Sequence, residues 1–296
     1  MTPSLPRAVT GLVLTLLLHG IAVASESLGP SSRRTPVVIS EIMYHPLLRA
    51  DGLDGEFVEL HNSQLWTEDI SGYRLSGAVD FEFPANTVIP AGGFLVVAKS
   101  PADAAAIFGI QGALGPYDGQ LSNDGETLRL RNPSGAVLLE IPYNDKAPWP
   151  LAADGLGHSL VLARPSAGES HPAAWAASSV MDGSPGSHLE PDREPWSAVV
   201  INEVSGHPTQ PGIGFVELLN RGTIPVEIGG MQLSVNRAPG FVVPPDTTLG
   251  TGERLLVPAQ APDLLLDGRP FLLALINPEK TRVLDAIRYS PHSPGT

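Results

Sequence analysis

The chain has 296 residues, of which 18 are Lys or Arg and 31 are Asp or Glu, giving a formal net charge of −13 at pH 7. With three lysines and no basic run, the sequence argues against binding to nucleic acid or to an anionic membrane surface. There is no cysteine, so folding rests on apolar cores rather than disulfides, and the chain is long enough to bury them.

The first 24 residues have the three parts of a secretory signal peptide. An apolar run over residues 8–18 precedes the small-residue cleavage site Ala22-Val23-Ala24. The alternative is an uncleaved anchor, but this run is shorter than the about 20 residues that a membrane span requires. We therefore expect cleavage after Ala24, a short linker over residues 25–36, no membrane span, and a protein that is secreted, periplasmic or at the cell surface.

Short apolar runs follow, separated by Gly, Pro, Asn and Asp, and this pattern predicts β-strands joined by turns. Alternation in Thr127-Leu128-Arg129-Leu130-Arg131 predicts a strand whose leucines face a core and whose arginines face solvent. One helix is expected over Pro101–Phe108, where a proline begins an alanine-rich run. The predicted strands of this first part cover residues 37–43, 57–61, 73–76, 94–98, 127–130 and 136–141. The class is all-β, a sandwich of antiparallel sheets.

The sequence contains an internal repeat with a period of the size of a domain. Six of ten residues agree between 37–46 and 199–208, and Phe57-Val58-Glu59-Leu60-His61-Asn62 is matched by Phe215-Val216-Glu217-Leu218-Leu219-Asn220. Six strands are predicted again in the same order, over residues 199–204, 215–219, 231–235, 254–257, 271–276 and 282–289. The repeat predicts two tandem domains, residues 37–187 and 199–296, joined by a Pro-rich linker over residues 188–198.

The motifs of the first copy resemble the lamin tail domain family as it occurs in secreted bacterial proteins. They are Val38-Ile39-Ser40-Glu41-Ile42, Phe57-Val58-Glu59-Leu60-His61-Asn62, Ile70-Ser71-Gly72-Tyr73-Arg74-Leu75, the segments 89–97, 121–128 and 154–160, Tyr143 with Trp149-Pro150, and the closing Ser184-Pro185-Gly186. The resemblance implies an immunoglobulin-like sandwich in each copy and a binding module without catalysis.

The second copy departs from this pattern at two places. Val226-Glu227-Ile228-Gly229-Gly230-Met231 replaces the Ser-Gly-Tyr turn, and the sequence ends seven residues after Tyr289, the counterpart of Tyr143. We therefore expect the second sandwich to be incomplete, without a closing strand, and open to association through the exposed edge.

Glu and His recur together in both copies, as Glu41 with His45 and Glu203 with His207, and each copy adds the glutamate of its second motif, Glu59 or Glu217. Such groups on adjacent strands are able to bind a divalent cation. The alternative, which we favour, is that Glu59 and Glu217 accept hydrogen bonds from buried loop amides and hold the sandwich together.

Three further segments carry candidate groups. Asp51-Gly52-Leu53-Asp54-Gly55-Glu56 has oxygen ligands at alternate positions but lacks the spacing of an EF-hand, which favours an acidic loop over a calcium site. Asn123-Asp124-Gly125 indicates a turn of the hairpin kind, and Trp149 is expected to fill the core rather than to stack on a ligand. His158 and Ser159 are adjacent on a predicted strand, so their side chains point apart and do not form a nucleophile and base pair.

The sequence contains no Gly-x-Ser-x-Gly elbow, His-Glu-x-x-His, phosphate-binding loop or cysteine nucleophile, so we assign no catalytic, cofactor-binding or metal residue and expect no enzyme. We expect an exported interaction or surface-display module whose partner is a protein or glycan at the cell surface. The alternatives are the N-terminal targeting portion of a larger extracellular enzyme or spore-coat-kinase-like protein, and a calcium-dependent carbohydrate-binding protein.

Overall fold

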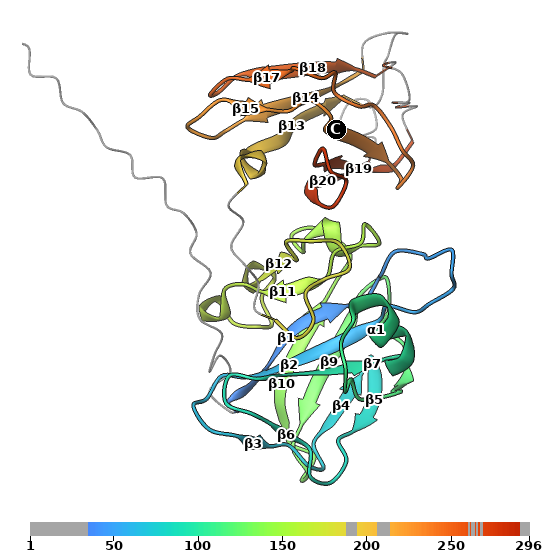
Figure 1. Cartoon of the computed structure of the whole chain (residues 1–296), viewed down its shortest axis with the longest axis vertical. Coiled ribbons are helices and arrows are strands. Elements are labelled where there is room, and N and C mark those ends of the chain that lie inside the picture. Colours follow the sequence, from blue (N-terminus) through green and yellow to red (C-terminus); the bar gives the residue numbers. More distant parts are fainter. Residues whose placement is uncertain are drawn as a thin grey trace, which may run out of the picture.

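The computed structural model describes residues 35–187, 194–205, 214–259, 261, 264, 266 and 269–290. The predicted signal peptide, the linker over 25–36 apart from its last two residues, the first part of the 188–198 linker, and His207 lie outside the described residues. No helix of the described part is long and apolar enough to cross a membrane. The two copies form two β-rich halves (Figure 1).

The first half is a sandwich of two antiparallel five-stranded sheets. One sheet has the order β12-β11-β1-β2-β7, with β1 (Val37–Met43), β2 (Phe57–Asn62), β7 (Phe94–Ala98), β11 (Leu160–Leu162) and β12 (Trp175–Ala177). The other has the order β10-β9-β4-β5-β8, with β4 (Arg74–Gly77), β5 (Val79–Glu82), β8 (Asp118–Gly119), β9 (Glu126–Arg131) and β10 (Val137–Tyr143). A short pair, β3 (Glu68–Asp69) and β6 (Val88–Ile89), lies beside them.

The second half repeats the same strands in smaller sheets. One three-stranded sheet consists of β13 (Val199–Ser205), β14 (Phe215–Asn220) and β18 (Arg254–Pro258), and the other of β16 (Gln232–Val235), β19 (Phe271–Ile276) and β20 (Val283–Tyr289). A short pair, β15 (Val226–Glu227) and β17 (Thr248–Leu249), accompanies them. In the described residues β13 has no strand partner on the side where β1 has β11.

The predicted all-β class with tandem immunoglobulin-like sandwiches is confirmed, and the predicted strands end within two residues of the observed ones. The alternation in β9 is also confirmed, because Leu128 and Leu130 are fully buried while the arginines lie on the outer face. The leucines pack with Ile39 and Leu60 in the core between the two sheets. This packing of one apolar face from each sheet is what holds a sandwich together.

The helix is confirmed as α1 (Pro101–Phe108). Ser100 caps its first turn by accepting from the Asp103 backbone N–H at 3.3 Å, and Gly109 ends it in the left-handed region at φ 69°. The helix covers the outer face of the first sheet, where Phe108 packs on Phe57 with ring centroids 5.2 Å apart. Because α1 and the 178–187 segment cover that face, every residue of β1 and β2 is buried.

Short 3₁₀ helices occupy several connections: η1 (Leu151–Ala153), η2 (Pro165–Ala167), η3 (Pro172–Ala174) and η4 (Pro195–Ala198). The last of these falls in the predicted linker. Its Trp196 donates an N–H to the Glu227 carbonyl at 3.0 Å and packs against the second core. Residues 195–198 are therefore part of the second sandwich rather than a spacer.

Candidate functional site

Two glutamates lie opposite each other on the outer face of the first sheet. Glu41 in β1 is the cross-strand partner of Glu59 in β2, directly after a β-bulge at Ser40. Both side chains are 1% exposed. The bulge changes the direction of the β1 side chains locally, which places a carboxylate rather than an apolar group on this face.

The carboxylate of Glu41 is held by groups from distant parts of the chain. Its Oε1 accepts the backbone N–H of Ser184 at 2.8 Å and the hydroxyl of Ser159 at 2.5 Å, and its Oε2 accepts the Ser184 hydroxyl at 3.2 Å. Every one of these donors belongs to the part of the chain that follows β10. Glu41 therefore fastens the end of the first domain to its first strand.

Glu59 has a similar role beside it. Its Oε1 accepts the Ser40 hydroxyl at 2.6 Å, and its Oε2 accepts the Gly186 backbone N–H at 2.5 Å. The interpretation of Glu59 as an acceptor for a loop amide is confirmed, although the donor Gly186 is an exposed residue rather than a buried one. The donors on Glu41 and Glu59 include both ends of Ser184-Pro185-Gly186, which we call the Ser-Pro-Gly clamp.

Burial raises the pKa of both carboxyl groups. For Glu59 burial is the largest cause, the neighbouring Glu41 charge adds to it, and the pKa reaches about 8. Two carboxylates this close in a buried site do not both ionise at neutral pH. The pair therefore holds a proton, and its oxygen atoms are engaged by the clamp, so it does not act as a solvent-facing acid or base.

The histidine of the same motif lies elsewhere. His45 Nδ1 is 2.8 Å from Asp154 Oδ1 and not at Glu41, so the Glu-x₃-His pattern does not form one site in the first copy. In the second copy Glu203 is exposed and Glu217 is half-buried. Glu217 Oε1 accepts the Asn202 amide at 2.7 Å and lies 3.1 Å from Arg254 Nε. The prediction that Glu217 accepts a buried loop amide is wrong for the described residues, because no loop covers this side chain there.

The acidic loop 51–56 does not bring its oxygen atoms together. Asp51 forms an ion pair with Arg49, and Asp54 Oδ1 accepts the Glu56 backbone N–H at 2.9 Å. In the part of the chain that the structure describes, no group of three His, Cys, Asp or Glu side chains is placed to hold a metal ion. The geometry is that of an ordinary acidic loop.

Glu56 itself points inward, which the sequence reasoning missed. Its Oε1 accepts the Tyr117 hydroxyl at 2.5 Å and the Leu121 backbone N–H at 2.7 Å. Burial raises the pKa of this carboxyl group. The side chain ties the 51–56 loop to the segment that leads into β9.

The predictions for two other segments have mixed outcomes. Trp149 fills the core, as expected, with its ring centroid 6.3 Å from that of Trp175. Asn123-Asp124-Gly125 does form a turn, with the Gly125 N–H donating to the Ser122 carbonyl. The hairpin part of that prediction is wrong, because β9 pairs with β4 and β10 and not with the strand before the turn.

His158 and Ser159 precede β11 instead of lying within a strand. Their side chains do point apart: Ser159 bonds to Glu41, while His158 Nε2 accepts the Val283 backbone N–H of the second half at 2.9 Å. His158 Nδ1 therefore carries the proton and donates to the Ser178 carbonyl at 2.8 Å. Burial lowers the pKa of His158 to about 4. This histidine is a neutral link between the two halves.

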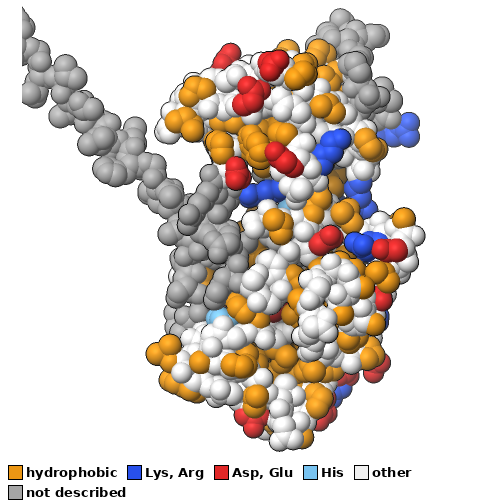
Figure 2. Space-filling model, viewed as in Figure 1, with side chains coloured by type: hydrophobic (Ala, Val, Ile, Leu, Met, Phe, Trp, Pro, Cys, Tyr) orange, Lys and Arg blue, Asp and Glu red, His pale blue; other side chains and the backbone are white. Residues whose placement is uncertain are grey.

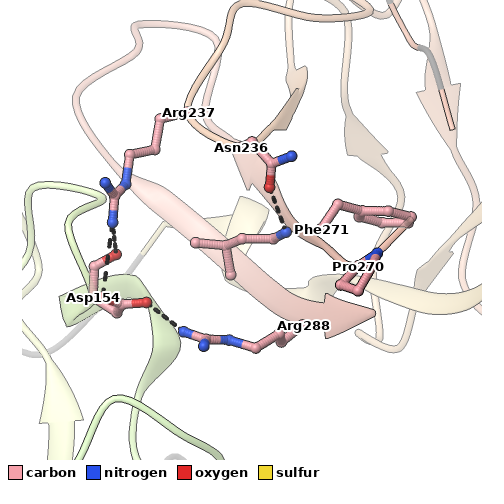
Figure 3. Close-up of a pocket in the computed structure, with 7 residues that line it drawn as sticks. Asp154, Asn236, Arg237, Pro270, Phe271 and Arg288 are labelled. Atoms are coloured by element: carbon pink, nitrogen blue, oxygen red, sulfur yellow. Dashed lines mark hydrogen bonds and ion pairs between the residues drawn. The ribbon is translucent and has the colours of Figure 1, made fainter. Parts of the chain in front are cut away.

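Further contacts join the η1 region of the first half to β19 and β20 of the second half, and we call these contacts the seam. Figure 1 shows β20 on the side of the second half that faces the first. The apolar part of the seam consists of Leu151, Ala152, Leu156, Leu272, Ala274 and Val283. Beside it, Arg288 Nη2 contacts Asp154 Oδ2 at 2.5 Å, and Arg237 Nη2 donates to the Asp154 carbonyl at 3.3 Å. Figure 3 shows both guanidinium groups approaching Asp154 from the second half.

A pocket and a groove lie next to each other at this seam. A pocket of about 310 Å³ is lined by Asp154, Asn236, Arg237, Pro270, Phe271, Leu272 and Arg288 (Figure 3). A wider groove of about 570 Å³ runs between the 45–54 loop, the 120–123 segment and Arg237. Arg237 lines both. Figure 2 shows several basic side chains at the waist where the halves meet.

Asn62 and Asn220 have an equivalent structural role in the two copies, which the sequence analysis did not identify. Each is fully buried and ends the second strand of its copy. Asn62 Nδ2 donates to the carbonyls of Trp66, Ile89 and Pro90, and Asn220 Nδ2 donates to those of Ile224 and Leu249. The signal was available, because the asparagine closes the Phe-Val-Glu-Leu-x-Asn motif in both copies.

Residues 30–145 match the family model described as Lamin Tail Domain. This match falls on the first sandwich and leaves the second copy outside it. The matched residues reach the end of β10, so β11, β12 and the Ser-Pro-Gly clamp lie beyond them. The second copy lies outside the match and repeats the first two motifs with the same strand register.

No curated protein matches the chain. Solved structures that are similar include an inhibited exo-beta-D-glucosaminidase CsxA, at 14% identity over 86% of this chain and 26% of that one, with a TM-score of 0.20. The Amycolatopsis orientalis exo-chitosanase CsxA is 13% identical over 80% of this chain and 25% of its own, also with a TM-score of 0.20. The chain spans about a quarter of those chains, and a likeness at this TM-score carries no argument about either fold or function.

Proposed function

We propose that the chain is an exported, non-catalytic interaction module that binds an extended segment of a partner protein in the groove at the seam. The observation that carries this proposal is that one groove is lined by the 45–54 loop of the first half and by Arg237 of the second half. The contacts of His158, Arg288 and the apolar seam hold the two halves together, so they keep the two sides of this groove in place.

The side chains of the groove indicate the chemistry of its partner. Leu48 is fully exposed at its rim and Leu47 lies beside it, while the guanidinium groups of Arg49, which pairs with Asp51, and Arg237, which contacts Asp154, also line it, together with Asp54. Exposed aliphatic side chains next to guanidinium groups favour a peptide that carries an aliphatic residue and a carboxylate. No Trp, Tyr or Phe is among the described residues that line the groove, and this supports a protein partner over a glycan.

This function fits either a free exported protein or the targeting portion of a longer extracellular protein. In both cases the groove does the binding. In the residues that the structure describes, no specific observation favours the calcium-dependent carbohydrate-binding alternative.

The proposal is tested by comparing two exposed leucines. Leu48 lies at the rim of the groove, and Leu65, which is exposed to a similar degree, lies outside its lining and serves as the matched control. The exported chain is used to select binders from a random-peptide display library. We expect acidic, aliphatic peptides whose affinity falls at least tenfold with Leu48→Asp or Arg237→Ala and is unchanged with Leu65→Asp.

Selection of no peptide, or equal loss with Leu48→Asp and Leu65→Asp, would contradict the assignment of the groove. A glycan array with the same three variants provides the opposite test. Glycan binding that depends on Leu48 would replace the proposed protein partner with a carbohydrate.

A further inference from the structure

The two halves are joined through a buried histidine. His158 is 0% exposed, and its Nε2 accepts the Val283 backbone N–H at 2.9 Å while its Nδ1 donates to the Ser178 carbonyl at 2.8 Å. Ser178 belongs to the first half, and Val283 begins β20 of the second. Both ring nitrogen atoms are therefore used, and this contact between the halves exists only while Nε2 carries no proton.

A proton on Nε2 has no acceptor in this position. It would face the Val283 backbone N–H, which is itself a donor, in a site where both residues are buried. The charged groups around the ring do not compensate. Arg282, next to Val283, disfavours a second positive charge, and Glu41 bonds to Ser159, whose side chain points away from that of His158. Protonation therefore requires that Val283 move away from the ring.

Val283 belongs to a strand that is fixed to the second half. It pairs with Ile276 of β19, so it does not move independently of its own sheet. Just before β20, the Thr281 carbonyl accepts the backbone N–H of Met181, which lies in the first half, at 3.1 Å. The end of the first half and the start of β20 are thus joined by two neighbouring contacts, and loss of the one at His158 acts on the joint between the halves.

The protonation of His158 is linked to this joint. Burial lowers the pKa of His158 to about 4 from an ordinary value of 6.5, and the Arg282 charge adds to this effect. Between these two values the joined state holds no extra proton on the ring, whereas a separated state, in which the ring meets water, does. The joined state is therefore fully favoured above pH 6.5 and loses up to about tenfold in its equilibrium constant per pH unit as the pH falls toward 4.

We propose that His158 is an acid-sensitive latch: protonation of its Nε2 releases Val283, and the two halves separate while they stay covalently connected. Because the groove at the seam is lined by both halves, separation also opens the groove. This inference rests on the contacts of His158 and not on the proposed function of the groove.

The test is amide hydrogen exchange on the intact chain between pH 6.5 and pH 4, expressed as protection factors so that the intrinsic pH dependence of exchange is removed. We expect the protection of the Val283 and Met181 amides to fall together, by up to about 300-fold over this range. The Leu233 amide donates to the Phe241 carbonyl within the second half at 2.8 Å, so it is the internal control and should stay protected.

A variant isolates the contribution of the ring. Asp145 and Asp154 bond to Arg288 in the same seam, and they belong to the joint as well. His158→Gln keeps an acceptor for Val283 and a donor for Ser178 but does not titrate, so the Val283 and Met181 amides should stay protected in acid. His171→Gln, at an exposed histidine of the first half, is the matched control and should keep the full pH dependence.

Protection of Val283 that does not change with pH in the unmodified chain would overturn the proposal without reliance on any variant. A fall confined to Val283, with Met181 unchanged, would mean a local movement at the start of β20 and would overturn the separation of the halves. The same pH dependence in His158→Gln as in the unmodified chain would assign the acid sensitivity to other groups of the seam, and so overturn the role of His158.

Discussion

The two copies of the motif Phe-Val-Glu-Leu-x-Asn place the same residues in the same register. The asparagine makes the same contacts in both copies, whereas the glutamate does not. Asn62 and Asn220 are both fully buried and bind the same kind of turn carbonyls. Glu59 is buried and bound by a loop amide, whereas Glu217 is half-buried beside Asn202 and Arg254. Identical strand geometry therefore gives identical contacts for the asparagine and not for the glutamate.

The difference follows from where each contact comes from. The asparagine bonds to a turn that directly follows its own strand and to the loop before the next strand of the sheet, and both copies contain these elements. The glutamate points to the outer face, where its partners belong to the segment after β10 in the first copy. Contacts with neighbouring turns therefore recur wherever the motif recurs, whereas contacts with a covering segment depend on the chain outside the motif.

The second sheets show the same principle at the seam. The outer face of β9 carries Arg129, which bonds to Glu140, whereas the equivalent face of β19 and β20 carries Leu272, Ala274 and Val283. The apolar face packs on the η1 region of the first half, and the charged face has no such cover. The outer face of a sheet is thus apolar where another segment packs on it and charged where it does not.

The largest effect is expected where the copies agree. Asn62→Ala and Asn220→Ala each remove a buried amide and leave two or more carbonyls without a donor, so each should lower the free energy of unfolding of its own half by about 3 kcal/mol. Amide hydrogen exchange in β1–β2 and in β13–β14 measures the two halves separately. A loss confined to Asn62→Ala would show that the second motif does not hold its turn.

The next largest effect on stability is expected for the glutamate of the motif, and it should differ between the two copies. Glu59→Ala removes a buried carboxylate that accepts from the Ser40 hydroxyl and the Gly186 N–H, and it is expected to cost the first half about 1–3 kcal/mol. Glu217→Ala removes a contact with an exposed arginine and should change the second half by less than about 0.5 kcal/mol. The same exchange measurement applies, and a loss with Glu217→Ala as large as with Glu59→Ala would mean that a covering segment reaches Glu217.

The smallest effect concerns pH. Because the pKa of Glu59 is raised to about 8, the folded first half holds a proton that the unfolded chain has released above its ordinary pKa of 4.5. Stability should therefore fall as pH rises through this window, by about 1 kcal/mol between pH 6 and 7. The measurement is urea unfolding followed by tryptophan fluorescence in Trp196→Phe, where the remaining tryptophans lie in the first half.

Glu59→Gln provides the control for this pH dependence. A glutamine keeps an acceptor for the Gly186 N–H and loses the titration, so the slope between pH 6 and 7 should become flatter. Glu217→Gln should leave the slope unchanged. An unchanged slope in Glu59→Gln would assign the pH dependence of the first half to other groups.

Much of the fold was predictable from the sequence. The alternation in β9, the proline at the start of α1 and the repeated motif predict strands, the helix and the tandem copies, because period, propensity and turn chemistry act over a few residues. The candidate site was predictable in part. Glu59 was identified as a structural acceptor, but its donor Gly186 is 127 positions away, and no local pattern reports a contact at that separation.

The sequence by itself determined the internal repeat, the all-β class and the inward-facing leucines of β9, because a period of two on a strand decides which side is apolar. Only the tertiary structure decided which outer faces are covered, that His158 joins the halves rather than pairing with Ser159, and that Arg237 meets the 45–54 loop in one groove. Those outcomes depend on which distant segment packs on a face. Burial there sets hydrogen bonding and pKa, so Glu59 is buried with a raised pKa in one copy, while Glu217 is half-buried beside Asn202 and Arg254 in the other.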